Sequence, residues 1–290
     1  MSKILNETAL VSLIKTALAE DIGSGDATTL ATVPENTKVT GVLLAKENCV
    51  CAGLVVAQKV FHELDKNIRF KPLVKEGEYC LKGTLLAEIT GDAQSILTGE
   101  RTALNYLQRI SGIATITHKY VEQTKGSKTR ILDTRKTTPG LRMLEKYAVA
   151  MGGGTNHRFG LFDRVMIKDN HREMASMNGP GGITRSVEAC RKKYPSLEVE
   201  VEADTLEEVQ EAADAGADYI LLDNMSNDEV KQAVKIIRGR SQVEVSGGIT
   251  IDRIPSLSTI EGVDFISVGA LTHSVRSTDI SLDIQIDSDS

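Results

Sequence analysis

The chain has 290 residues, of which 41% are hydrophobic and 26% are charged, and its formal net charge is −6. A globular chain of this length can bury roughly three quarters of its unfolded surface, in one large domain or two moderate ones. The net acidity argues against a general nucleic-acid binder, which needs a net basic face, but it permits a local basic pocket for a small anion.

The N-terminal segment predicts an amphipathic helix between Met1 and Glu20. Apolar side chains recur there at helical spacing, namely Leu5, Leu10, Leu13, Ile14 and Leu18. The segment lacks a basic start, a long apolar centre and a small-residue cleavage site, so we do not expect a secretory signal. No apolar run in the sequence reaches the roughly 20 residues of a membrane span.

The cysteines indicate a reducing compartment. Cys49, Cys51, Cys80 and Cys190 are too few and too irregularly spaced for a disulfide framework, and they form no pair of zinc knuckles. Cys49 and Cys51 fall on one face of an expected strand, where buried reduced thiols are the simplest interpretation. We therefore expect a cytoplasmic protein.

The N-terminal third of the chain predicts a mixed α+β unit. Strand-like alternation starts at Lys38, a helix is expected over Leu54–Leu64, and short strands follow at residues 70–74, 78–79 and 85–89. A long helix is expected over residues 95–121, with Gly112 as a break in it. Arg101 lies on the more polar side of its first part.

After residue 129 the pattern becomes strand, loop and helix, repeated six times. The expected strands are 130–133, 164–168, 198–202, 219–223, 242–246 and 264–268. Helical patterns lie between them, and Thr205 with Glu208 forms a capping box at the start of one. Such a series implies a parallel sheet with crossover helices, and closure into an open, irregular six-stranded α/β barrel.

Each expected strand ends in polar or glycine residues. These ends are Asp133–Lys136, residues 168–171, Glu202, residues 223–224, residues 246–248 and residues 269–270. Barrel active sites lie at the carboxyl ends of the strands, in the loops that follow them. Six such ends in one repeating pattern predict a site at this edge of the sheet.

The strand Glu198-Val199-Glu200-Val201-Glu202 alternates acid and valine. A period of two places the three glutamates on one face, and we expect that face to point into the barrel while the valines meet the outer helices. The alternative is a solvent-facing edge strand, although the neighbouring strands are nearly continuous apolar runs. Interior acids need cations, and Lys168 on the preceding strand could supply one.

Glycines after the last two strands predict a phosphate site. Ser246, Gly247, Gly248 and Gly269 would let backbone N–H groups approach an oxyanion, although a glycine pair alone is usually a turn. The run Gly152-Gly153-Gly154 follows a helix rather than a strand, so it is interpreted as a flexible loop and not as a dinucleotide fingerprint.

Basic residues are dense between Arg130 and His171. They are Arg135, Lys136, Arg142, Lys146, His157, Arg158, Arg164, Lys168 and His171. A solvated charged face is the ordinary explanation of such a run, and His157 alone could be a structural histidine. Several of these residues adjoin strand ends beside Gly and Thr, which favours capture of an anion.

Many motifs together resemble the quinolinate phosphoribosyltransferase family. They include ERTALNYLQRISGIAT at 100–115, DTRKTTPGLR at 133–142, KYAVAMGGGTNHRFGLFD at 146–163, MIKDNH at 166–171, ILLDN at 220–224, VSGGIT at 245–250 and VGALTHS at 268–274. The resemblance extends nearly from end to end. It implies phosphoribosyl transfer from phosphoribosyl diphosphate to quinolinate with loss of CO₂, which yields nicotinate mononucleotide for NAD synthesis.

The resemblance also implies the domain plan and the assembly. Residues 1–113 would form an N-terminal α/β sandwich to which a C-terminal strand in residues 276–290 returns, and residues 114–275 would form the catalytic barrel. Two subunits, or a higher oligomer, would pair so that each sandwich closes the other's barrel. Arg101 would then enter the site of the partner.

Site roles follow from the same resemblance. Quinolinate would be bound by Arg135, Lys136, His157, Arg158 and Lys168, together with Arg101 from the partner subunit. Glu202 and Asp223 would bind the ribose and, through water, Mg²⁺, and Ser246, Gly247, Gly248 and Gly269 would hold the 5-phosphate. With Lys168, these two acids are the expected catalytic groups, and Glu202 is favoured over Glu200 as the first of them. Asn170 and His273 match motif positions without an assigned role.

Three other interpretations remain open from the residues. A barrel lyase or aldolase could use Lys168 as a Schiff-base amine. A divergent relative of the same fold, such as the paralogue associated with molybdenum transport, could act on another substrate. A metabolite sensor could use the same scaffold without catalysis.

Overall fold

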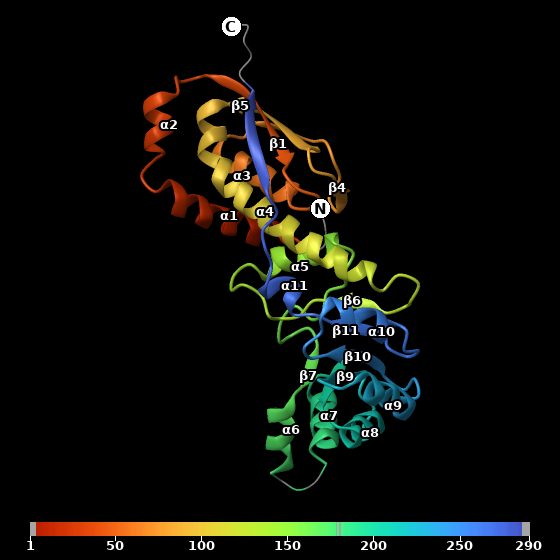
Figure 1. Ribbon diagram of the computed structural model, residues 1–290. Coiled ribbons are helices and arrows are strands. Elements are labelled where there is room, and N and C mark those ends of the chain that lie inside the picture. The colour runs from red at the N-terminus through yellow and green to blue at the C-terminus, as the bar shows by residue number, and fades with distance from the viewer. Residues whose placement is uncertain (1–3, 178, 180, 286–290) are drawn as a thin grey trace. The chain divides into compact units, whose positions relative to one another are not determined.

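The computed structural model describes residues 4–177, 179 and 181–285. The chain divides into two compact units (Figure 1). The first contains the chain up to His118, Thr137–Gly153 and the chain from Leu271, and the second contains Lys119–Lys136 and Gly154–Ala270. The boundary predicted at residue 113 stays a prediction, and the segment Thr137–Gly153 groups with the first unit. Within the described residues, no helix combines the length and hydrophobicity needed to cross a membrane.

The first unit is built on a four-stranded antiparallel sheet in the order β12-β1-β5-β3. Its strands are β1 (Lys38–Ala45), β3 (Arg69–Pro72), β5 (Leu85–Asp92) and β12 (Ile280–Gln285), and β2 (Cys49–Cys51) pairs with β4 (Glu78–Cys80) separately. The expected strand at 280–284 is thus β12, which lies beside β1 although nearly the whole chain separates the two.

Helices of the first unit bury their apolar faces. They are α1 (Glu7–Ile22), α2 (Ala27–Thr32), α3 (Leu54–Leu64), the first part of α4 (Ala93–Glu122) and α5 (Arg142–Met151), while α11 (Ala270–His273) starts at the unit boundary. Phe61 of α3 packs on Phe70 of β3 with ring centroids 6.3 Å apart, which joins helix to sheet. The expected helix over Leu54–Leu64 is confirmed, and the N-terminal helix begins after Asn6, whose side chain accepts a hydrogen bond from Ala9 N–H. Met1–Lys3 of that expected helix lie outside the described residues.

Two glycines have roles that the sequence did not reveal. The expected break at Gly112 is wrong, because α4 runs unbroken through it. A Cβ at Gly112 would lie 2.4 Å from the Arg276 carbonyl oxygen, so the glycine serves close packing of the C-terminal segment. Gly152 ends α5, and a Cβ there would lie 2.4 Å from the Ala114 oxygen, so this residue is packed rather than loose.

The second unit is an open parallel sheet of six strands in the order β6-β11-β10-β9-β8-β7. Its strands are β6 (Arg130–Leu132), β7 (Val165–Ile167), β8 (Val199–Ala203), β9 (Tyr219–Asp223), β10 (Gln242–Ser246) and β11 (Phe265–Ser267). All six expected strands are present, and the described strand order leaves β6 and β7 at its two edges. The predicted open six-stranded α/β architecture is confirmed.

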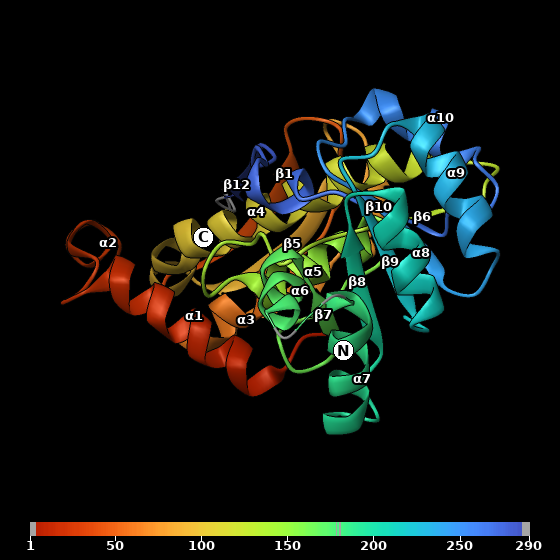
Figure 2. The ribbon, with the colours of Figure 1, turned by 90° about the horizontal axis from the view of Figure 1, so that it is seen from below.

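Helices lie outside these strands (Figure 2). They are α6 (Asp169–Ser176), α7 (Gly182–Lys193), α8 (Leu206–Asp214), α9 (Asn227–Ile237) and α10 (Ile254–Ser258), with a 3₁₀ turn η1 (Ile251–Arg253) before the last. The capping box of Thr205 and Glu208 begins α8 as predicted. Val199 and Val201 are fully buried, as expected for valines that face the helices.

The cysteines are free, as expected. Cys49, Cys51 and Cys80 are buried, and Cys190 is partly exposed. Burial raises the pKa of Cys49 to about 11, so its thiol stays protonated and unreactive at neutral pH.

Candidate active site

The predicted site residues of the second unit gather at the carboxyl edge of its sheet. In spatial order the strand ends carry Asp133–Lys136 after β6, Gly269 after β11, Ser246–Gly248 after β10, Asp223 of β9, Glu202 of β8 and Lys168 after β7. Because the strands are parallel and adjacent, all these groups lie along one edge. The roles given to them remain predictions.

The loop with His157 and Arg158 is attached to the end of β6. Thr155 bridges to Leu132 in parallel, and its N–H donates to the Ile131 oxygen at 2.8 Å. Asp133 is fully buried and accepts hydrogen bonds from the Asn156 amide at 2.6 Å and from the backbone N–H of His157 at 2.8 Å. This buried carboxylate therefore fixes the basic loop beside Arg135 and Lys136.

Arg158 is a buried cation beside a second cation. Its Nη1 donates to the Arg164 carbonyl oxygen at 3.1 Å, while its buried Nε has no hydrogen-bond partner among the described residues. Burial lowers the pKa of Arg158, and the positive charge of Arg135 lowers it further. An anion that bound both guanidinium groups would relieve this repulsion and satisfy the open donor.

Lys168, Glu202 and Asp223 form a charged group on three neighbouring strands. Lys168 Nζ lies 2.8 Å from Glu202 Oε2, and the cation predicted for this strand of acids is confirmed at that one position. Burial raises the pKa of Asp223, and the charges of Glu202 and Asp204 raise it further against the opposing effect of Lys168 and Lys136. The negative potential at this corner would favour a bound cation.

Glycine is required at the end of β10. Gly247 has φ +87°, and a Cβ on it would lie 2.2 Å from Asn224 Oδ1. Asn224, itself left-handed at φ +56°, donates its N–H to the Ser246 oxygen at 3.1 Å. The β9 and β10 loops therefore approach each other closely, and Gly248 leaves open space beside them.

The three glutamates of the acid and valine strand differ in exposure, which the sequence did not predict. Glu200 is fully buried and Glu202 is half-buried, whereas the side chain of Glu198 is 59% exposed at the other end of the strand. The expected inward face therefore holds for Glu200 and Glu202 only, because Glu198 lies beyond the rim of the sheet.

A buried cluster of four side chains was missed. His157 Nε2 lies 3.1 Å from Glu200 Oε2 and 3.6 Å from Glu244 Oε2, and Arg164 Nη1 lies 3.4 Å from Glu200 Oε2. Burial acts to raise the pKa of Glu200, but His157 and Arg164 outweigh it and lower the pKa; burial and the Glu200 charge raise the pKa of Glu244 well above its usual range. The sequence signal was Glu244 between Val243 and Val245 in a core strand.

In this cluster the His157 ring nitrogen that faces the two glutamates carries a proton, so the cluster is not arranged to bind a metal ion. One ligand atom each from His157, Glu200 and Glu244 lies within 4.8 Å of the others. However, His157 Nδ1 accepts a hydrogen bond from the Arg158 N–H at 2.6 Å, so the neutral ring carries its proton on Nε2. A protonated nitrogen cannot ligate a metal.

The remaining candidates belong to the first unit or to the first turn of α6. Arg101 is exposed on α4 in the first unit, and Arg142 and Lys146 belong to α5 of that unit, with Lys146 buried. Asn170 and His171 start α6, where the His171 ring accepts from Lys168 N–H at 3.0 Å, and His273 is exposed at the end of α11.

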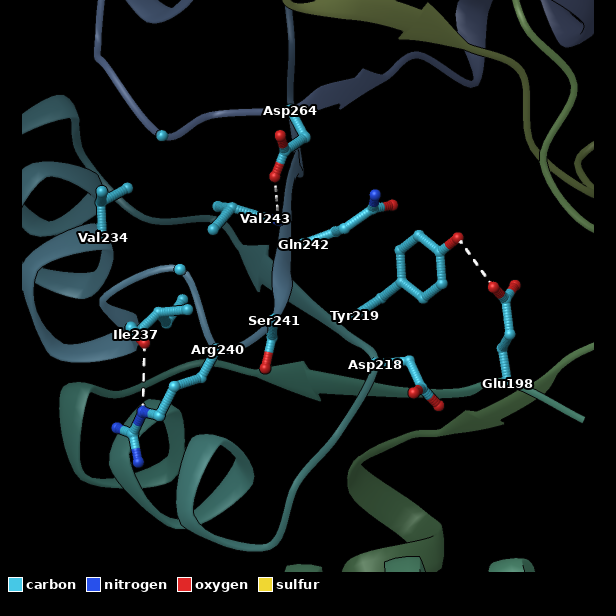
Figure 3. Close-up of a pocket in the computed structure, with 12 residues that line it drawn as sticks. Glu198, Asp218, Tyr219, Val234, Ile237, Arg240, Ser241, Gln242, Val243 and Asp264 are labelled. Carbon is cyan, nitrogen blue, oxygen red and sulfur yellow. Dashed lines mark hydrogen bonds between the residues drawn. The ribbon is translucent and has the colours of Figure 1, made fainter. Parts of the chain in front are cut away.

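A hollow of about 460 Å³ lies at the opposite edge of the same sheet (Figure 3). Its polar groups are engaged in joining strands: Asp264 accepts from the Val243 N–H at 2.8 Å, and Asp218 accepts from the Val199 N–H at 2.7 Å. Tyr219 donates to Glu198 at 3.3 Å in the same hollow. These contacts stabilise the sheet and present no group for chemistry.

Comparison with known proteins covers nearly the whole chain. Two family models match, "Quinolinate phosphoribosyl transferase, N-terminal domain" over residues 26–111 and "Quinolinate phosphoribosyl transferase, C-terminal domain" over residues 113–283. A probable nicotinate-nucleotide pyrophosphorylase [carboxylating] of Bacillus subtilis is 42% identical, over 99% of this chain and 97% of its own. A chloroplastic nicotinate-nucleotide pyrophosphorylase [carboxylating] of Arabidopsis thaliana is 43% identical, over 95% and 82%.

Solved structures agree with these sequences. The structure of NadC from Streptococcus pyogenes superposes with a TM-score of 0.92 at 41% identity, covering 99% of this chain and 100% of its own. The nicotinate-nucleotide pyrophosphorylase of Francisella tularensis gives a TM-score of 0.90 at 40% identity, covering 97% and 98%.

Proposed function

The chain belongs to the quinolinate phosphoribosyltransferase family, and from that membership we propose how its residues carry out the reaction of the family. The enzyme transfers the phosphoribosyl group of phosphoribosyl diphosphate to quinolinate and removes CO₂. The products are nicotinate mononucleotide, diphosphate and CO₂, so the activity serves NAD synthesis.

The quinolinate site is proposed around the guanidinium groups of Arg135, which is half-buried, and Arg158, which is buried. The observation that carries this proposal is the open Nε donor of Arg158 in a position where Arg135 lowers its pKa. Two carboxylates on one ring call for several cations, and arginine can donate two hydrogen bonds to each carboxylate. Lys136 and Lys168 would add charge at the rim, and His157 would hold the loop in place.

Glu202 and Asp223 are proposed to bind the ribose and, through water, Mg²⁺. Carboxylate oxygens suit this ion, which keeps several water ligands, and the raised pKa of Asp223 marks a corner where a cation is favourable. When bound, the ion would neutralise charge on the diphosphate leaving group.

The 5-phosphate is assigned to the ends of β10 and β11. Ser246, Gly247, Gly248 and Gly269 would surround it with a hydroxyl group and backbone N–H groups. Since β10 lies between β9 and β11, this site adjoins Asp223 and would place the ribose over the two acids.

The chemistry requires no covalent intermediate with the protein. The quinolinate nitrogen attacks the anomeric carbon as the C–O bond to diphosphate breaks, and positive charge develops on the ribose. The ionised carboxylates would stabilise that charge in place. When the carboxylate departs as CO₂, the bonding electron pair stays on C2, where the positive charge of the adjacent pyridinium nitrogen stabilises it, and C2 then takes up a proton.

Lys168 is assigned to binding rather than to a Schiff base. Its Nζ is engaged by Glu202 Oε2 at 2.8 Å, and an ion-paired amine is not a free nucleophile for a carbonyl substrate. The lyase interpretation therefore has no structural support beyond the position of the residue.

Turnover with both substrates tests the proposed function directly. We expect diphosphate and CO₂ to be released in equal amounts, and only when quinolinate and phosphoribosyl diphosphate are both present. Diphosphate release without CO₂, or no turnover, would contradict the assignment of the substrate.

Arg135→Ala and Lys168→Ala should each weaken quinolinate binding by about 1–3 kcal/mol, because each removes a charge-assisted contact to a desolvated carboxylate. Titration calorimetry measures this, and binding of phosphoribosyl diphosphate should change less. Lys235→Ala, at an exposed position of α9, is the matched control. Unaltered quinolinate affinity in both variants would refute the site.

A homodimer, or a higher oligomer built from it, completes the proposal. Arg101 of the partner subunit would reach the quinolinate site. In support, Leu161 and Phe162 beside the basic loop are each 72% exposed, which is the kind of apolar surface that a partner covers. A cytoplasmic location belongs to the same proposal and fits the free cysteines.

A further inference from the structure

Glu200, Glu244 and Arg164 of the buried cluster have no part in the proposed chemistry, although the fourth member, His157, belongs with Arg158 to the basic loop, here called the quinolinate loop. The contacts of the cluster form a closed circuit around Arg158. The His157 ring accepts from the Arg158 N–H and approaches Glu200, Glu200 pairs with Arg164, and the Arg164 carbonyl accepts from Arg158 Nη1. Arg164 is held in addition over the Tyr219 ring, 3.9 Å from its centroid.

Charge and proton counts fix the state of Glu244. His157 Nδ1 faces the Arg158 N–H at 2.6 Å, so this nitrogen accepts a hydrogen bond. Arg164 is the cation paired with Glu200, and it also pairs with Glu198 at 3.5 Å, so an ionised Glu244 would add a negative charge without a cation of its own in a buried site. Glu244 is fully buried, its Oε2 lies 3.6 Å from His157 Nε2, and burial and the negative charge of Glu200 raise its pKa, so a proton on Glu244 is positioned for donation to Glu200.

We propose that Glu244 is a positioning residue for quinolinate binding: as a neutral carboxylic acid beside Glu200, it holds the His157 ring in the Nε2–H form and thereby orients Arg158. The naming of the ligand rests on the proposed function. The orientation of the His157 ring is a property of the protein without substrate, so this part of the proposal does not depend on the proposed function. Glu244 lies two residues before Ser246 on β10, so it also links the phosphate corner to the quinolinate loop.

Two near-isosteric variants separate hydrogen bonding from packing. Glu244→Gln keeps a neutral donor toward Glu200 and should leave the quinolinate Kd within about twofold of wild type. Glu244→Leu removes every polar atom and should weaken quinolinate binding about tenfold or more, with a smaller change for phosphoribosyl diphosphate. Glu207→Gln, at an exposed position of α8, is the control and should match wild type.

The ring of His157 supplies a readout that does not involve substrate. The sequence has only five histidines, so ¹⁵N-histidine labelling gives few signals, and the His157 signals are assigned by their loss in His157→Gln. Wild type and Glu244→Gln should show one protonated ring nitrogen, Nε2. Glu244→Leu should show a mixture of tautomers or a broadened signal.

Several outcomes would overturn the proposal. One is a loss of quinolinate affinity in Glu244→Gln as large as that in Glu244→Leu, which would mean that an ionised carboxylate is required. Another is a Glu244→Leu variant with unchanged affinity and tautomer. If Glu244→Leu does not fold, Glu244→Gln alone tests the proposal. A changed His157 tautomer in Glu244→Gln would contradict the proposal that Glu244 is a neutral acid. Wild-type protein that shows the tautomer but binds no quinolinate would contradict the proposed function instead.

Discussion

Glu202→Gln and Asp223→Asn should each slow the chemical step on the order of tenfold or more, which corresponds to about 1.4 kcal/mol of barrier. Both changes keep size and hydrogen-bonding capacity but remove a charge that would stabilise the developing cation on the ribose. Single-turnover rates measured beside binding constants test this. Quinolinate affinity should be unchanged or somewhat higher in Glu202→Gln, because Lys168 loses its pairing with the acid at 2.8 Å.

A reversed pattern would give the two acids another role. If they only neutralise Lys168, quinolinate binding would change and the chemical step would be spared. Glu207→Gln is the matched control, since it removes the same charge from an exposed position of α8. Wild-type single-turnover rates in both variants would end the catalytic assignment.

Mixing two inactive variants should restore activity if Arg101 acts in the site of the partner. Arg101→Ala and Arg135→Ala subunits should each be inactive alone, because every site of each homodimer then lacks one arginine. In a heterodimer, one of the two sites carries both arginines, so re-equilibrated subunits should regain about a quarter of wild-type turnover when half of the dimers are mixed.

Subunit exchange must be verified by mass before the result is interpreted. Mixing Arg135→Ala with Lys168→Ala is the control, since these residues belong to one compact unit and every site in the mixture stays defective. Absence of recovery in the first mixture after verified exchange would place Arg101 in the site of its own chain or outside any site.

The strands of the second unit could be predicted because each is a short apolar run that ends at a polar residue. That pattern reflects burial on both faces of a parallel sheet, and it located Lys168, Glu202 and Asp223 at one edge. The unbroken course of α4 could not be predicted, since the need for Gly112 lies in a segment far along the chain at Arg276. Propensity alone cannot reveal such a contact.

The buried cluster was missed for a different reason. Period two correctly pointed Glu200 inward, but its partners His157, Arg164 and Glu244 come from a loop and two other strands whose side-chain contacts depend on tertiary packing. Lys168 was expected to supply one cation to these acids, and the acid that it reaches is Glu202. The exposed position of Glu198 followed from where the sheet ends, which the alternation does not specify.

The pairing of β12 with β1 bears on the order in which the protein can fold during synthesis. Leu282 lies opposite Leu43, so β1 lacks one neighbour until the ribosome has made almost the entire chain. Until then the N-terminal sheet exposes an unpaired edge, the feature that promotes association between nascent chains. The last strand also closes a loop that contains the whole second unit, and such long-range pairing is slow. The strands of the second unit can therefore assemble first, and completion of the N-terminal sheet waits for β12, which follows that unit in the chain.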